Sequence, residues 1–262
     1  MGFLAIDIGN TNITTGYFPL GDLTETRKIP SSMDPPEYWS QIFAWLGGER
    51  FRGVQAIGVS SVVKDLETEI LEALSGVDPV SVSQPPALHV ITRDFPFPLK
   101  SAYQQGLLGT DRMLAAVAGA ALFGKPVITV DIGSAVTIDL VDRKGVFRGG
   151  QILLGGGLRS KALAAFTSLL PEIPVPQSPP PLIGTNTVEC LGSGIYHGMR
   201  AEIKGLVSKI QKEARTRAAV VLTGQGSLLF EESRPSGWQI EKFLVLKGIY
   251  YSCQRQDLAL QE

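Results

Sequence analysis

Two stretches of this chain, far apart in the sequence, present the same chemical groups in the same order. Residues 3–13 read FLAIDIGNTNI, and residues 127–137 read VITVDIGSAVT. In both, an apolar strand ends in an aspartate, Asp7 or Asp131, and an Ile-Gly turn, a small polar residue and a second strand follow. A carboxylate and bare backbone amides are therefore presented together twice in one chain.

These groups suit the binding of a metal-bound phosphate. An aspartate at a strand end can bind Mg²⁺ directly or through water, and the adjacent glycine lets phosphate oxygens approach the main chain without a β-carbon in the way. A single copy is better explained as an ordinary β-turn, because Asp, Gly and Asn are common turn residues. Two copies in matched context favour two similar halves with a metal phosphate between them, which suggests a phosphotransferase.

A third segment, Gly-Thr-Asp-Arg at residues 109–112, offers acid–base chemistry. Asp111 lies at the start of a predicted helix, where helix capping is one explanation for it. Arg112 is less expected there, because a cation opposes the dipole at a helix N-terminus; it indicates either an anion to be bound or a surface ion pair. A carboxylate beside a bound anion could accept a proton from a substrate hydroxyl, the step that a phosphoryl acceptor needs.

Composition narrows the class of partner. The 262 residues suffice for one large domain or two ordinary ones. The formal net charge of −1 at pH 7 provides no field for nucleic acid or an anionic membrane, so small molecules are the expected partners. The two cysteines lack C-x-x-C spacing, and no signal-peptide pattern or membrane-spanning apolar run is present, which together predict a cytoplasmic protein.

The elements that must position these groups follow an alternating pattern. Short Val- and Ile-rich segments bounded by Gly, Pro or Asp predict strands, and helical periodicity fills the intervals between them, which favours an α/β fold. Two strands joined by a tight turn open each half, unlike a simple βαβ unit. The predicted strands are residues 2–7, 12–18, 53–60, 87–91, 127–131, 135–142, 146–152 and 218–223, and the predicted helices are 36–46, 65–73, 111–122, 160–169, 188–213 and 241–256.

The motifs, taken as an ordered set, carry a resemblance to a known family. The chain resembles the type III pantothenate kinases, members of the acetate and sugar kinase/actin superfamily, in DIGNT at 7–11, GTDR at 109–112, DIGSAVTID at 131–139, GGQI at 149–152 and TG at 223–224. The resemblance implies a duplicated actin-like (ribonuclease H-like) α/β fold, with two similar halves around a central cleft. We place these halves at residues 1–112 and 113–262, with the last helix able to pack back on the first half.

The resemblance also implies an activity and its cofactors. The activity is ATP-dependent phosphorylation of pantothenate to 4'-phosphopantothenate, the first step of coenzyme A biosynthesis, with Mg²⁺ and a monovalent cation, K⁺ or NH₄⁺. By position, Asp7 lies nearest the Mg²⁺ and Asp131 ligates the monovalent cation. The implied ATP-binding residues are Asp7, Ile8, Gly9, Asn10, Thr11, Asn12, Ile13, Thr14 and Ser134.

The pantothenate site is implied in the same way. Asp111 becomes the general base toward the primary hydroxyl, and Arg112 orients the anionic acceptor. In this family a partner subunit helps to shape the pocket closed by the threonine that matches Thr187, so a homodimer is implied. The substrate-binding residues are then Tyr103, Gly109, Thr110, Asp111, Arg112 and Thr187.

Some positions depart from the family pattern, and two other functions remain open. Ser134 replaces the usual threonine, and Gln225 follows Thr-Gly where a second glycine is usual. Another small-molecule kinase of the superfamily is one alternative, because a shared fold does not fix the acceptor. A non-catalytic transcriptional regulator of the Bvg accessory factor type is the other. The intact Asp7, Asp111 and Asp131 favour catalysis, because a regulator needs neither a base nor metal ligands.

Overall fold

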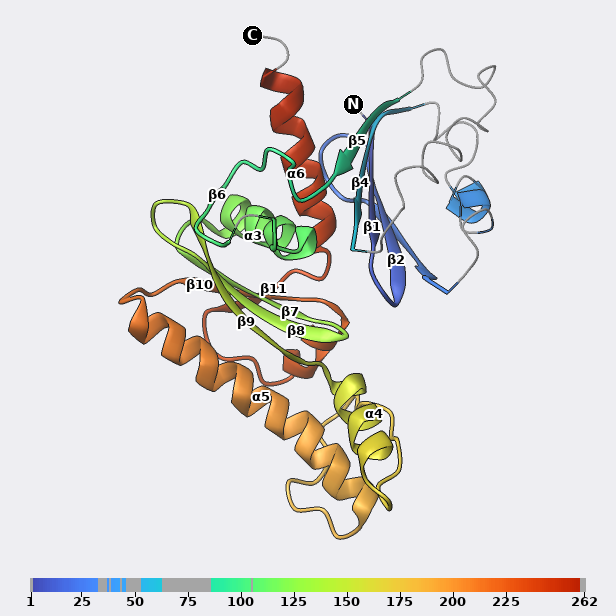
Figure 1. Cartoon of the computed structure of the whole chain (residues 1–262), viewed down its shortest axis with the longest axis vertical. Helices are drawn as coiled ribbons and strands as arrows, with labels where there is room; N and C mark the ends of the chain where they lie inside the picture. Colours follow the sequence, from blue (N-terminus) through green and yellow to red (C-terminus); the bar gives the residue numbers. More distant parts are fainter. Residues whose placement is uncertain are drawn as a thin grey trace. The chain divides into compact units, whose positions relative to one another are not determined.

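The computed structural model divides into two compact units, each built around one β-sheet (Figure 1). It describes residues 2–32, 37, 39–42, 44–45, 53–62, 86–104 and 106–259, with side chains through residue 254. Unit 1 comprises Met1–Pro98, Gln104–Ala118 and Val245–Glu262, and unit 2 comprises Leu99–Tyr103 and Gly119–Leu244. The boundary expected between residues 112 and 113 stays a prediction.

Unit 1 contains a mixed five-stranded sheet in the order β3-β2-β1-β4-β5. The first three strands form an antiparallel meander, whereas β4 and β5 run parallel to β1. Side chains alternate between two buried faces, as the period of two in a strand requires. The strands are β1 (Gly2–Ile8), β2 (Asn12–Phe18), β3 (Glu25–Pro30), β4 (Val54–Ser61) and β5 (Ala87–Ile91).

The C-terminal helix α6 (Leu244–Ala259) packs on one face of this sheet. The Tyr250 ring stacks on Phe18 with ring centroids 4.7 Å apart, and it meets Phe3 edge-on at 5.3 Å. A β-carbon at Gly58 would lie 2.6 Å from Ile249 Cγ2, so glycine there lets the helix approach the strand closely. The opposite face packs against a separate apolar cluster that includes Trp39.

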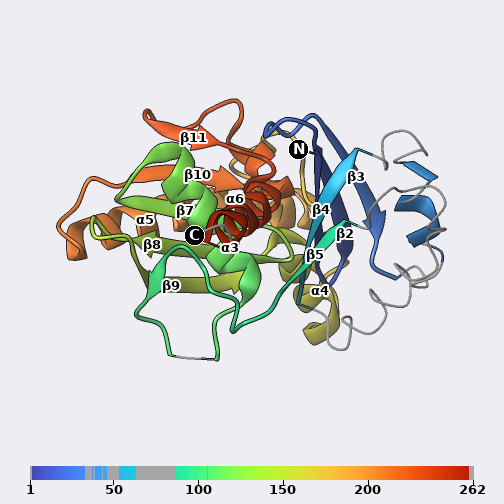
Figure 2. The same ribbon diagram turned by 90° about the horizontal axis from the view of Figure 1, so that it is seen from above.

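Unit 2 contains a six-stranded sheet in the order β11-β10-β7-β8-β9-β6. Strands β7, β8 and β9 form an antiparallel meander like that of unit 1, and β10 runs parallel to β7. Figure 2 shows β11, β10, β7, β8 and β9 in this order across the sheet. The strands are β6 (Lys100–Ser101), β7 (Val127–Ile132), β8 (Ala135–Val141), β9 (Val146–Leu154), β10 (Ala219–Thr223) and β11 (Trp238–Ile240).

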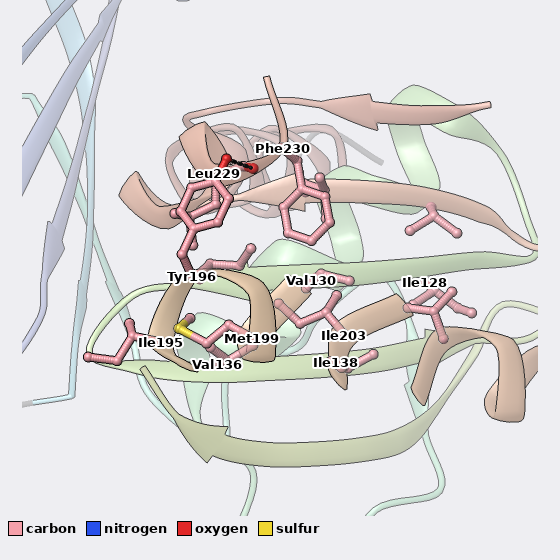
Figure 3. Packing of buried hydrophobic residues seen from close by; sticks show 14 of the residues in the cluster. Ile128, Val130, Val136, Ile138, Ile195, Tyr196, Met199, Ile203, Leu229 and Phe230 are labelled. Atoms are coloured by element: carbon pink, nitrogen blue, oxygen red, sulfur yellow. Dashed lines mark hydrogen bonds between the residues drawn. The ribbon is translucent and has the colours of Figure 1, made fainter. Parts of the chain in front are cut away.

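The long helix α5 (Thr187–Glu213) covers one face of the unit 2 sheet (Figure 1). The core residues are spaced two apart along the strands and four apart along the helix, so in each element they point to one side. These spacings match the periods of a strand and of a helix. Tyr196 donates a hydrogen bond of 3.4 Å from its hydroxyl to the Leu229 carbonyl at the edge of this core. Figure 3 shows the core, including Ile128, Val130, Val136, Ile138, Ile195, Met199, Ile203 and Phe230.

Most predicted elements are present, with shifts at their ends. Helices α3 (Thr110–Phe123) and α5 and all eight predicted strands agree to within two residues, whereas α4 spans Gly156–Phe166 rather than residues 160–169. The sequence did not predict β3, β6, β11 or the 3₁₀ helix η2 (Gln225–Phe230). The helix predicted at 65–73 and part of that at 36–46 lie outside the described residues. None of the helices in the described part of the chain combines the length and apolar character that a bilayer crossing requires.

Candidate active site

The first aspartate is the penultimate residue of β1. Strands β1 and β2 pair Ile8 with Ile13, and residues 9–12 form the loop between this pair, with Asn12 also beginning β2. Gly9 N donates to the Asn12 carbonyl at 3.0 Å and closes it. Asp7 is half-buried, while Asn10 and Thr11 are exposed. The loop thus presents its polar tip to solvent beside a carboxylate, as phosphate and metal binding require.

Two neighbouring segments fix the main chain of this loop. Ser31, just after β3, donates from Oγ to the Gly9 carbonyl at 2.6 Å and from its backbone N to the Thr11 carbonyl at 3.0 Å. On the other side, Val62 N donates to the Ile8 carbonyl at 3.1 Å. The conformation of the loop therefore depends on β3 and β4 as well as on its own hairpin.

The Gly109–Arg112 segment is anchored to the same sheet. The hydroxyl of Ser60, at the end of β4, donates to Thr110 Oγ1 at 3.0 Å, and both residues are buried. Ser60 is also the Cα partner of Asp7 in the parallel pair β1 and β4, so the two side chains lie on one face of the sheet. The segment that carries Asp111 is therefore held at the carboxyl end of β4, beside the strand that ends in Asp7.

The side chains of Asp111 and Arg112 differ in exposure. A β-carbon at Gly109 would lie 2.5 Å from Asp111 Oδ1, so glycine gives the carboxylate room beside the turn. Asp111 is half-buried and lies in the first turn of α3. Arg112 is only 6% exposed, so its side chain lies in the interior and not at the surface. A buried guanidinium next to a partly accessible carboxylate is compatible with anion binding and proton transfer.

In unit 2, three glycine-containing segments converge at the turn between β7 and β8. Gly133 N donates to the Ala135 carbonyl at 2.9 Å, and Gly155 N donates to the Ser134 carbonyl at 2.9 Å. A β-carbon at Gly155 would collide with the Gly133 and Ser134 carbonyls. On another side, Gly224 has φ +75° and lies against Asp131 and Ile132. The segments of Gly155 and Gly224 fit around Asp131 and Ser134 only because these two positions lack a β-carbon.

The glycine-rich run at 155–157 opens α4. Gly155 is its N-cap, and the next two glycines lie in the first helical turn. Thr223, at the end of β10, is buried, and its hydroxyl donates to the Lys242 carbonyl at 3.2 Å. The Thr223 hydroxyl also accepts from Leu244 N at 3.3 Å, so it is engaged by the segment that leads into α6.

The two remaining predicted substrate residues lie on different elements of unit 2. Tyr103 follows β6 and meets Phe147 edge-on, with ring centroids 6.2 Å apart. Thr187 is exposed and begins α5 after the N-cap Asn186, whose side-chain oxygen accepts from Glu189 N at 3.0 Å. The backbone N and hydroxyl of Thr185 both donate to Glu189 Oε2, at 2.8 and 2.9 Å.

This capping network also lowers the pKa of Glu189. The hydrogen bond from the Thr185 backbone, followed by those from its hydroxyl and from Asn186, holds the pKa of Glu189 below its ordinary value. The carboxylate therefore remains ionised at the helix N-terminus, where negative charge is favoured. The start of α5, and with it Thr187, is held in a defined place.

The structure thus groups the predicted site residues into two sets. Unit 1 brings the Asp7 loop and the Gly109–Arg112 segment to one sheet end, and unit 2 brings Asp131 and Ser134 together with Gly155 and Gly224. Sequence reasoning missed Ser31 and Ser60. Their only local signal is a serine directly after or at the end of a strand beside the predicted phosphate loop, and their partners lie 22 and 50 positions away.

Comparison with known proteins gives consistent matches over most of the chain. The family model described as type III pantothenate kinase matches residues 3–209. A type III pantothenate kinase from Sulfurihydrogenibium sp. is 32% identical over 95% of this chain and 98% of its own length. One from Moorella thermoacetica is 32% identical over 94% of this chain and 96% of its own length.

Solved structures agree on the fold. A protein from Campylobacter jejuni, described as a Baf family transcriptional activator, has a TM-score of 0.61 at 20% identity, covering 97% of this chain and 98% of its own. Component A of (R)-2-hydroxyglutaryl-CoA dehydratase from Acidaminococcus fermentans has a TM-score of 0.55 at 13% identity, covering 98% and 99%. At these identities the likeness shows the fold alone. The duplicated actin-like α/β fold class expected from the sequence is confirmed.

Proposed function

The chain belongs to the type III pantothenate kinase family, and on this premise we propose that it transfers the γ-phosphoryl group of ATP to pantothenate. The product is 4'-phosphopantothenate, which begins coenzyme A synthesis. The observation that carries the proposal is the buried hydrogen bond between Ser60 and Thr110, because it holds the Gly109–Arg112 segment beside the strand that ends in Asp7. Phosphoryl transfer requires the donor and the acceptor to be held close together, and these two segments are the ones proposed to bind them.

The residues of unit 1 have different roles in the proposed reaction. The loop at residues 9–12 binds the phosphates, and Asp7 supports the Mg²⁺ that neutralises them. Asp111 takes the proton of the pantothenate hydroxyl as that oxygen attacks the γ-phosphorus, while the bond from phosphorus to the bridging oxygen of ADP breaks. Arg112, being buried, binds the pantothenate carboxylate more tightly than an exposed arginine would.

The cations fit the donor atoms that the chain offers. Within the described residues, no three His, Cys, Asp or Glu side chains are grouped to hold a metal ion, so Mg²⁺ would take most of its ligands from the triphosphate and water. For a monovalent cation, Asp131 Oδ1 and the Ile132 carbonyl lie beside the same glycine, Gly224. Paired carboxylate and carbonyl oxygens suit K⁺ or NH₄⁺ at this place.

We propose that a second copy of the chain binds to an apolar surface on unit 2 and forms a homodimer. Phe166 and Leu169 at the end of α4 are 88% and 90% exposed, and Ile183, before α5, is 83% exposed. Thr187 lies four residues after Ile183, so a subunit that covers this surface would lie at the residue expected to close the pantothenate pocket. An apolar surface of this kind marks an interaction site. The exposed apolar residues on β9, on α4 and on the chain between α4 and the first turn of α5 are Ile152, Leu154, Leu158, Leu163, Phe166, Leu169, Leu182, Ile183 and Val188.

The test is an assay of purified protein with ATP, Mg²⁺ and K⁺ against pantothenate, together with a panel of other hydroxy acids and sugars. We expect ADP release that depends on pantothenate and falls when either cation is omitted. Turnover of another acceptor in preference to pantothenate would favour a different small-molecule kinase. Absence of turnover with every acceptor would favour the non-catalytic regulator. A cytoplasmic location remains a prediction from the sequence.

A further inference from the structure

We propose that Ser31 is a positioning residue for the phosphate-binding loop, which it holds with the carbonyl oxygens turned away from the nucleotide. The inference rests on the proposed function, because it assigns a role in ATP binding. Ser31 lies just after β3 and is half-buried. Its hydroxyl and its backbone N both donate to carbonyls of the loop, Gly9 and Thr11, at 2.6 and 3.0 Å.

The carbonyls around the loop are almost all engaged by donors of the protein. Besides the two that Ser31 binds, the Ile8 carbonyl accepts from Val62 N at 3.1 Å, and the Asn12 carbonyl accepts from Gly9 N at 3.0 Å. Among residues 8–12, Asn10 is the one whose carbonyl has no such donor among the described residues. Asn10 is exposed, and no hydrogen bond among the described residues involves it. The loop thus directs four carbonyl oxygens at internal donors and leaves its tip available to a ligand.

This arrangement matters because the ligand is an anion. A carbonyl oxygen that faced a phosphate would repel it, whereas a backbone N–H attracts it. Gly9 adopts many backbone conformations at little cost, so the peptide between Gly9 and Asn10 can rotate unless its oxygen is held. The Ser31 hydroxyl provides that restraint from outside the hairpin. Without it, conformers with the Gly9 carbonyl toward the phosphate compete with nucleotide binding.

The corresponding turn in unit 2 shares the backbone restraint but lacks the hydroxyl. There Gly155 N donates to the Ser134 carbonyl at 2.9 Å, as Ser31 N donates to the Thr11 carbonyl at 3.0 Å. Glycine has no side chain that could donate to a further carbonyl, as the Ser31 hydroxyl does to that of Gly9. Ser31 is therefore a place where one side-chain substitution tests the restraint of a phosphate-binding turn. Because Ser31 contacts only the loop carbonyls among the described hydrogen bonds, its effect should be confined to the nucleotide.

The experiment compares Ser31→Ala with Ser31→Thr, which keeps the hydroxyl, and with Ser32→Ala, an exposed neighbour, as the matched control. Binding of Mg·ADP is measured by calorimetry, and kcat and both KM values are measured by ADP release. We expect Ser31→Ala to raise the Kd for Mg·ADP and the KM for ATP about 3- to 10-fold, the range of one lost hydrogen bond. The KM for pantothenate should stay within about twofold.

Ser31→Thr should retain most of the nucleotide affinity, and Ser32→Ala should match the parent protein. Equal nucleotide affinity in Ser31→Ala and the parent would overturn the inference, as would an equal rise in the KM for pantothenate. If Ser31→Ala does not fold, Ser31→Cys, a weaker donor, is measured in its place against the same expectation. A parent protein that binds no Mg·ADP would instead refute the proposed function, and the role of Ser31 with it.

Discussion

Ser60 and Thr110 are 50 positions apart, yet their hydroxyls share a buried hydrogen bond of 3.0 Å. Ser60 is the penultimate residue of β4 and pairs with Asp7, and Thr110 begins α3 next to Asp111. Two motifs that the sequence shows separately are therefore joined through a residue that belongs to neither.

The link between Ser60 and Thr110 should appear as coupling between mutations. Ser60→Ala and Thr110→Val should each lower kcat and the free energy of unfolding, and the double variant should lose less than the sum of the two. We expect a coupling of about 0.5–1.5 kcal/mol in the free energy of unfolding, typical of one hydrogen bond. Urea unfolding of the four proteins measures it, and strictly additive losses would contradict the role assigned to this bond.

Asp111→Asn removes the proposed base but keeps the size of the side chain. We expect kcat to fall about 10²- to 10⁴-fold, the usual contribution of a general base. Binding of Mg·ADP should change little, because the nucleotide is assigned to the other loop. Steady-state kinetics with thermal melting as the control for folding make the measurement. Unaltered turnover would exclude Asp111 as the base.

Gly224→Ala should be more damaging than an equivalent change elsewhere. Gly224 has φ +75°, and an added β-carbon would collide with Asp131 and Ile132. Gly237 is the matched control: its φ is +81°, but its β-carbon would meet nothing within 4 Å. Gly237→Ala should show the backbone strain alone, about 1 kcal/mol in the free energy of unfolding.

The additional loss in Gly224→Ala then reports the contact with Asp131. We expect that variant also to need a higher K⁺ concentration for half-maximal activity, because the Asp131 carboxylate must move. Titration of activity against KCl measures this effect, with NaCl used to keep the ionic strength constant. If the two glycine variants lose the same free energy of unfolding, the close packing at Gly224 does not contribute to stability.

The cap of α5 should weaken in acid. The hydrogen bonds from Thr185 lower the pKa of Glu189 below its ordinary value of 4.5. A carboxyl group with a lowered pKa in the folded state stabilises that state above the unfolded pKa, and this contribution disappears as the pH falls through the folded pKa. Glu189→Gln should therefore be less stable than the parent at pH 7, and the difference should shrink below about pH 4.5. A difference that does not change with pH would show that the charge of Glu189 has no part in the cap.

The sequence predicted the elements whose signals are local. The β1–β2 and β7–β8 hairpins combine apolar alternation with an Asp-Ile-Gly turn, and their strands agree closely with the structure. Strand β3 was missed because it reads ETRKIP, which is mostly polar and ends in proline, as an edge strand can. Strand β11 has three residues, too few to show a period.

The motifs of the proposed site could be predicted from the sequence, but the residues that support them could not. Asp7, Asp111 and Asp131 stand out by residue type and order, because the proposed chemistry requires a carboxylate at each place. The roles of Ser31 and Ser60 depend on partners brought close only by strand pairing, and serine is common at the ends of strands for other reasons. The start of α4 was misplaced because three consecutive glycines disfavour a helix on propensity alone.

The different restraints on the two turns have a consequence for natural and laboratory variation. A backbone N–H holds both turns, that of Ser31 in unit 1 and that of Gly155 in unit 2. Unit 1 adds the Ser31 hydroxyl, so a serine-to-threonine exchange should be tolerated there, whereas any side chain at Gly155 collides. A saturation library selected for coenzyme A–dependent growth should accordingly return a choice of hydroxyl residues at position 31 and glycine alone at position 155.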